Sequence, residues 1–185
     1  MALNRGESNA MLRAPMTIHP MIVHFPIAFL TVYAVFELLR FRKLNDNPMW
    51  LHLKVAFLLI GTAGSLAALV TGDMAKDLGL GVRGIVELHE KFAQTTVVIF
   101  SLLALNYIIL LGDQYIWSRL SGSVLKTWKI AVSIRRMIFK TPVVLLLAFA
   151  GLITLTITGA LGGIMVFGPD VDPVASFINK LLFPN

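Results

Sequence analysis

Four long apolar runs constrain this chain more than any other feature of its sequence. They lie at about residues 21–39, 50–71, 86–111 and 141–167, and each has about the 20 residues that an α-helix needs to cross a bilayer. A segment that crosses lipid must satisfy its own backbone hydrogen bonds, and runs of this length can do so as helices. The sequence therefore predicts an all-α, polytopic four-helix membrane bundle, with one transmembrane domain at residues 18–170 after a polar segment at 1–17.

The composition agrees with a membrane protein and excludes several kinds of site. Hydrophobic residues make up 57% of the chain and charged residues only 14%, against about 25% charged in a soluble domain. The absence of cysteine excludes disulfides, thiolate metal sites and covalently attached haem. The net charge of +6 arises from basic residues beside the apolar runs, as anionic lipid favours, so we expect the lipid bilayer and not nucleic acid as the partner.

Basic residues also predict the orientation of the chain. Ten of them flank or fill the first and third connections between runs, so the positive-inside rule puts both connections inside and both termini outside. They are Arg40, Arg42, Lys43, Lys54, Arg119, Lys126, Lys129, Arg135, Arg136 and Lys140. The first run has no small-residue cleavage site after it, so it is expected to be retained as a helix.

The connection at about residues 114–139 is long for a bundle, and its apolar residues recur at helical spacing. This pattern is typical of an amphipathic helix in the membrane interface, although a solvated loop is the alternative. The apolar residues on one side are Trp117, Leu120, Val124, Trp128 and Ala131. The tail at residues 171–185 predicts a second amphipathic segment on the outer surface.

A weak internal repeat suggests two similar helical hairpins. His24, Ala28 and Thr31 have the same spacing as His89, Ala93 and Thr96, and two glycines and a threonine repeat likewise in the second and fourth runs. Parallel repeats of this kind are related by an axis along the membrane normal. Under this repeat, His24 and His89 are symmetry mates near the outer face.

Two histidines on facing helices predict a haem site. Neutral imidazoles from two helices can hold haem iron in a bundle core, and the small residues beyond His24 and His89 would leave room for the macrocycle. We therefore predict haem b with His24 and His89 as its metal ligands, and His19, Arg83 and Lys91 close enough to meet its propionates. Because both axial positions would be filled, the expected chemistry is electron transfer.

Other roles for the histidines stay open. Imidazoles at a membrane interface also make structural hydrogen bonds, and ionisable groups within a span can carry protons. No pair of carboxylates is spaced for acid–base catalysis, so the chain is not expected to be an enzyme by itself. Glu37 is expected to form an interfacial ion pair with Arg40 or Lys54, and the glycines of the second and fourth runs are expected to let helices pack closely.

The sequence resembles the DUF2231 family of small bacterial membrane proteins. The resemblance covers about residues 18–170. It rests first on the segment 19–28, which begins His19-Pro20 and contains His24. The other matching motifs are Thr71-Gly72-Asp73, His89 and Gly162-Gly163. It implies a four-helix protein of the bacterial inner membrane, sometimes encoded beside redox components, with haem suspected at the histidines. The family often has an aromatic residue and a further histidine after the glycine pair, whereas this chain has Val166-Phe167 and no histidine there.

The leading functional hypothesis is therefore a subunit resembling a b-type cytochrome, which works with other membrane or redox subunits. One alternative is a cofactor-free structural or assembly subunit, because the glycine-rich fourth run and the amphipathic segments offer surfaces for a larger complex. A second alternative is a small transporter or proton-handling protein, which would need polar residues through the middle of the spans.

Overall fold

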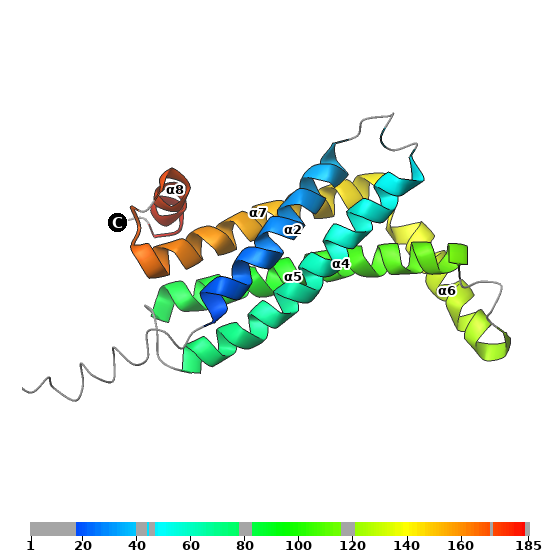
Figure 1. Ribbon diagram of the computed structural model, residues 1–185, viewed down its shortest axis with the longest axis horizontal. Helices are drawn as coiled ribbons and strands as arrows, with labels where there is room; N and C mark the ends of the chain where they lie inside the picture. Colours follow the sequence, from blue (N-terminus) through cyan, green and yellow to red (C-terminus); the bar gives the residue numbers. More distant parts are fainter. Residues whose placement is uncertain are drawn as a thin grey trace, which may run out of the picture.

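The computed structural model describes residues 18–39, 44, 47–77, 83–115, 121–170 and 172–183, and these are helical apart from short connections (Figure 1). The helices are α2 (His19–Leu38), α4 (Pro48–Asp77), α5 (Arg83–Tyr115), α6 (Gly122–Ile138), α7 (Thr141–Phe167) and α8 (Pro173–Leu182). The predicted all-α architecture is confirmed.

Four of these helices are long and apolar enough to span a membrane. They are α2, α4, α5 and α7, with candidate spans of 20, 29, 32 and 27 residues. The two middle spans extend beyond the apolar runs at both ends, and at their C-terminal ends polar residues such as Asp73 and Asp113 continue the helices. Asn47 accepts a hydrogen bond from the backbone N–H of Met49, so it caps the start of α4 before Pro48. At α7, Lys140 is the N-cap residue and Thr141 is already helical.

The four spans pack as two hairpins. α2 packs along α4 and α5 packs along α7, and the hairpins meet through contacts of α4 with α5 and of α2 with α7 (Figure 1). These contacts form a closed ring in which α2 and α5 stand opposite each other. The core between them contains fully buried side chains from all four spans: Leu30, Tyr33, Leu58, Phe100, Leu103 and Ala148.

Glycines allow the close approach within each hairpin. A Cβ added at Gly61 of α4 would lie 2.6 Å from Cδ2 of Leu30 in α2, and one added at Gly151 of α7 would lie 2.9 Å from Cζ of Phe100 in α5. Both distances are too short for real carbon atoms, so the helices can meet here only because neither residue has a side chain. The predicted packing role of these glycines is confirmed.

The buried positions of the two hairpins repeat, but the offset between matched residues differs from the one that the sequence suggested. Leu30 and Phe100 are matched buried positions, as are Glu37 and Tyr107, and the members of both pairs are 70 residues apart. Gly61 of α4 and Gly151 of α7 are matched by their contacts, with Leu30 and Phe100 respectively, although they are 90 residues apart. The 70-residue offset makes His19, not His24, the mate of His89.

Two further helices extend from opposite ends of the bundle (Figure 1). α6 leaves the end where α5 and α7 connect, which we call the α6 end. It buries Val132 and leaves Val124, Ile130 and Met137 more than half exposed, as expected of an interfacial amphipathic helix. Trp117 and Leu120 of the predicted apolar face lie outside the described residues.

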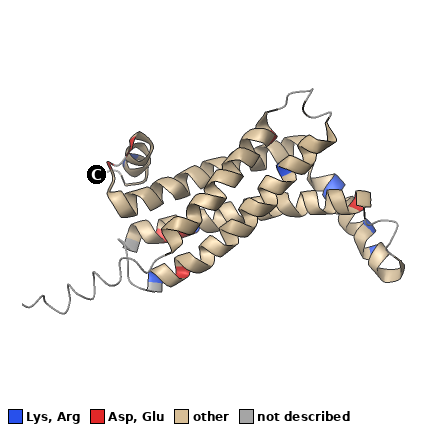
Figure 2. Cartoon of the chain, in the orientation of Figure 1, with Lys and Arg blue, Asp and Glu red and all other residues tan. Residues whose placement is uncertain are grey.

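α8 lies against α7 at the other end. Its buried Ala175 packs with Leu161 and Ile164 of α7, and the side chain of Asp172 accepts hydrogen bonds from the first two backbone N–H groups after Pro173. The predicted amphipathic tail is therefore a helix with one side buried on the bundle. Charged residues gather toward the two ends of the molecule (Figure 2). Four of the ten basic residues behind the predicted orientation lie outside the described residues, and the orientation stays a prediction.

Candidate functional site

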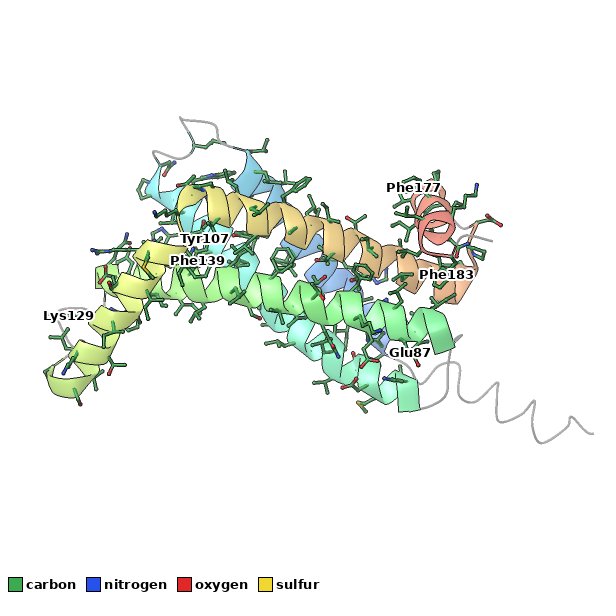
Figure 3. The ribbon with its side chains drawn as sticks, turned by 180° about the vertical axis from the view of Figure 1, so that it is seen from behind. Glu87, Tyr107, Lys129, Phe139, Phe177 and Phe183 are labelled. Carbon is green, nitrogen blue, oxygen red and sulfur yellow. The ribbon has the colours of Figure 1, made fainter. Side chains whose placement is uncertain are left out.

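His19 and His89 form the centre of the candidate site. His19 begins α2 and His89 lies in the second turn of α5, so the two rings come from the opposite helices of the bundle. Their centroids are 6.5 Å apart and their planes are nearly perpendicular, at 85°. We call this end of the molecule the histidine end. In Figure 3, Glu87, which lies two residues before His89, is at the opposite end of the bundle from Tyr107.

Each imidazole is held by the partner helix of its own hairpin. Nδ1 of His89 lies 3.0 Å from the backbone carbonyl oxygen of Thr158 in α7. Because a carbonyl only accepts, Nδ1 of His89 must carry the hydrogen and donate it. In the neutral ring, Nε2 is then an unprotonated nitrogen with a free lone pair, which is the form that binds metal.

His19 is held in a similar way. Its Nδ1 lies 3.0 Å from Oγ1 of Thr71 in α4, and this hydroxyl also lies 3.1 Å from the carbonyl oxygen of Ala68 in the preceding turn. If the hydroxyl donates to that carbonyl, Oγ1 accepts from Nδ1 of His19, and Nε2 of His19 is then unprotonated. Hydrogen bonds of this kind orient histidine ligands in metal sites. Sequence reasoning did not identify either acceptor.

Glycines lie against both rings, and the one at Gly72 makes room for His19. A Cβ added at Gly72 would lie 3.2 Å from Cε1 of His19, and one added at Gly162 would lie 3.5 Å from Cε1 of His89. Each imidazole thus lies against a glycine on the partner helix of its hairpin. The two histidine–glycine pairs are therefore matched between the hairpins, as the buried core positions are.

The structure does not bring His24 beside His89. His24 is exposed, and its Nδ1 lies within hydrogen-bonding distance of the carbonyl oxygen of Pro20 in its own helix. Five residues along an α-helix rotate a side chain by about 140° and move it about 7.5 Å along the axis. His24 therefore lies on another face of α2 than His19, and the predicted pairing of His24 with His89 is corrected to His19 with His89.

The two cations predicted near the histidines are not placed beside them. Arg83 begins α5, but its side chain lies outside the part of the chain that the structure describes. Lys91 is exposed, and it is two residues, or about 200° of helix rotation, from His89. At the same end, Lys76 of α4 forms an ion pair with Glu90 of α5.

His19 and His89 are the two side chains of this site that could bind a metal. Among the described residues, no group of three or more histidine, cysteine or acidic side chains could hold a metal ion. Two imidazoles can complete the coordination of a metal whose other ligands belong to a cofactor, as the four pyrrole nitrogens of haem do for its iron.

Comparison with known protein families places the whole bundle in one of them. The family model described as a predicted membrane protein, DUF2231, matches residues 15–173, which include both histidines and all four spans. The chain belongs to the DUF2231 family. No curated protein and no solved structure matches it.

A second polar cluster of this DUF2231 protein lies in the bundle toward the α6 end. Glu37 of α2 and Lys54 of α4 are 2% and 7% exposed, and Nζ of Lys54 lies 2.9 Å from Oε2 of Glu37. The hydroxyl of Tyr107 in α5 donates to the same oxygen at 2.6 Å. The predicted pairing of Glu37 with Lys54 is confirmed, while Arg40, the other predicted partner, lies outside the described residues. The pair is buried, and together with Tyr107 it joins three helices.

Proposed function

We propose that this DUF2231 protein is an electron-transfer subunit of a membrane, with one haem b whose iron is bound by Nε2 of His19 and Nε2 of His89. The observation that carries the proposal is the pair of imidazoles whose ring centroids are 6.5 Å apart, each held through Nδ1 by the partner helix of its hairpin. In the bound protein, haem would supply a one-electron couple. The chain itself orients both rings, and the carbonyl of Thr158 fixes the tautomer of His89.

The separation of the rings fits two bonds to one metal atom. An imidazole–metal bond is about 2.0–2.1 Å long, and each ring nitrogen is about 1.1 Å from its ring centre, so two axial imidazoles have centres about 6 Å apart. The centroid distance of 6.5 Å between His19 and His89 agrees with this value.

Ligation by two histidines favours electron transfer over oxygen chemistry. With both axial positions taken, the iron would have no open position for a substrate or for oxygen. A subunit of this kind needs an electron donor and an acceptor, so we expect it to contact other redox subunits.

An absorption spectrum tests the proposal. The full chain is purified after expression with haem supplied in excess, and the reduced-minus-oxidised spectrum is recorded for the wild type and for His19→Ala, His89→Ala and His24→Ala. We expect Soret and α-bands in the wild type, loss of both bands in the first two variants, and an unchanged spectrum in the third. His24→Ala is the matched control because it removes an imidazole five residues from His19 on the same helix.

Two results would overturn the proposal. Absence of a haem spectrum in the folded wild type would leave the cofactor-free structural subunit as the better hypothesis. Loss of the bands in His24→Ala together with retention in His19→Ala would return the ligand role to His24. Helix content by circular dichroism shows whether each variant is folded.

A further inference from the structure

A cavity at the α6 end has the chemistry of a lipid headgroup site. It lies between the end of α5 and the side of α6, has a volume of about 460 Å³, and is lined by Asp113, Lys129, Val132, Ser133 and Arg136. The lining contains two cations and one carboxylate, so its net charge is positive. Figure 2 shows charged residues of both signs where α6 meets the end of α5.

Arg136 is already oriented in this cavity. Its Nη2 lies 3.1 Å from Oδ2 of Asp113 on α5, while its side chain remains 69% exposed. A guanidinium has five N–H donors in a planar fork, so contact with one carboxylate oxygen leaves donors for a second oxyanion. The hydroxyl of Ser133 provides a further donor in the same lining.

An apolar strip adjoins the basic side of α6. Successive residues of a helix are rotated by about 100°, which puts Lys129, Ser133 and Arg136 on one side of α6 and Ile130 and Ile134 on the next. Ile130 and Ile134 are about half exposed, at 54% and 48%. A ligand on this side of α6 would therefore meet cations at one edge and exposed aliphatic side chains at the other.

The position of α6 limits what such a ligand can be. α6 connects two candidate membrane spans at their ends, so we expect it at the level where lipid headgroups meet water. A ligand with an anionic phosphate next to long apolar chains matches both edges of this surface. We propose that the cavity binds the headgroup of an anionic phospholipid, with its phosphodiester at Lys129 and Arg136 and its acyl chains along Ile130 and Ile134.

This site does not depend on the proposed haem. It lies at the opposite end of the bundle from the histidines, and none of its residues belongs to the histidine site. A soluble phosphate compound could meet the same cations, but it has no chains to cover the isoleucines. Lipid is therefore the occupant that uses both parts of the surface.

Lipid binding to the full chain in mild detergent tests the proposal. Phosphatidylglycerol or phosphatidylcholine is titrated into the wild type and into Lys129→Gln, Arg136→Gln and Lys126→Gln, and bound lipid is counted by native mass spectrometry. We expect the wild type to prefer phosphatidylglycerol, and Lys129→Gln and Arg136→Gln each to weaken its binding about fivefold. Lys126→Gln is the matched control because Lys126 is exposed on the same helix but does not line the cavity.

A fourth variant separates shape from charge. Ser133→Leu keeps every charge of α6 but fills part of the cavity, so it should weaken phosphatidylglycerol binding without changing the charge of the helix. Equal binding of the two lipids by the wild type would overturn the proposal. So would a loss in Lys126→Gln as large as in Lys129→Gln, unchanged binding in Ser133→Leu, or displacement of the lipid by an equal concentration of soluble glycerol phosphate.

Discussion

The buried pair of Glu37 and Lys54 allows a quantitative prediction of stability. Replacing Lys54 with methionine keeps the length of the side chain but removes the cation beside the buried carboxylate of Glu37, to which Tyr107 donates at 2.6 Å. Removing one partner of a buried ion pair costs about 3–5 kcal/mol, and a charge-assisted hydrogen bond that remains offsets part of this cost. We therefore expect Lys54→Met to lower the free energy of unfolding by about 3 kcal/mol, or roughly a hundredfold in the unfolding constant.

The double variant Glu37→Gln/Lys54→Met tests the cause of this loss. It removes both charges, while the amide oxygen at position 37 can still accept from Tyr107. We expect most of the stability to return, because a buried pair can often be replaced by neutral residues at little net cost. The free energy of unfolding is measured in mixed micelles by titration with a denaturing detergent, with helix content as the signal.

The exposed pair of Lys76 and Glu90 provides the control. Its side chains are 48% and 30% exposed, so Lys76→Met should change the stability by no more than about 1 kcal/mol. Two results would contradict a coupled buried pair of Glu37 and Lys54. One is a loss of free energy of unfolding in Lys54→Met as small as in Lys76→Met. The other is a loss in the double variant equal to the sum of the losses in its two single variants.

Two further predictions concern glycines. Gly72→Leu should displace His19, because its Cβ would lie 3.2 Å from Cε1 of that ring, and the haem spectrum should be lost. Gly84→Ala is the control: a Cβ there meets nothing within 4 Å, so the spectrum should be unchanged. Gly151→Val should lower the free energy of unfolding by about 1–3 kcal/mol, since its Cβ would lie 2.9 Å from a buried phenylalanine ring, and the same detergent titration measures the loss. An unchanged stability would contradict the close packing of α5 on α7.

Some features of the site could have been found in the sequence, and others could not. The sequence identified His89, and it named His19 among the residues near the site, but it gave the ligand role to His24. The spacing of 70 residues that pairs His19 with His89 also relates Leu30 to Phe100 and Glu37 to Tyr107, but those matches rest on burial, which only the structure shows. The carbonyl of Thr158 could not have been found, because every residue has one and only packing selects which carbonyl a side chain meets.

The sequence by itself determined the four spans and the two amphipathic helices. The reason is that length and hydrophobicity are local properties, and a chain in lipid has few other ways to satisfy its backbone. The choice of histidine was a matter of tertiary structure. α2 is apolar on all sides, so its pattern does not indicate which face turns inward. Contacts such as Leu30 on Gly61 set the rotation of α2 about its axis. That rotation brings His19 to His89 and leaves His24 exposed.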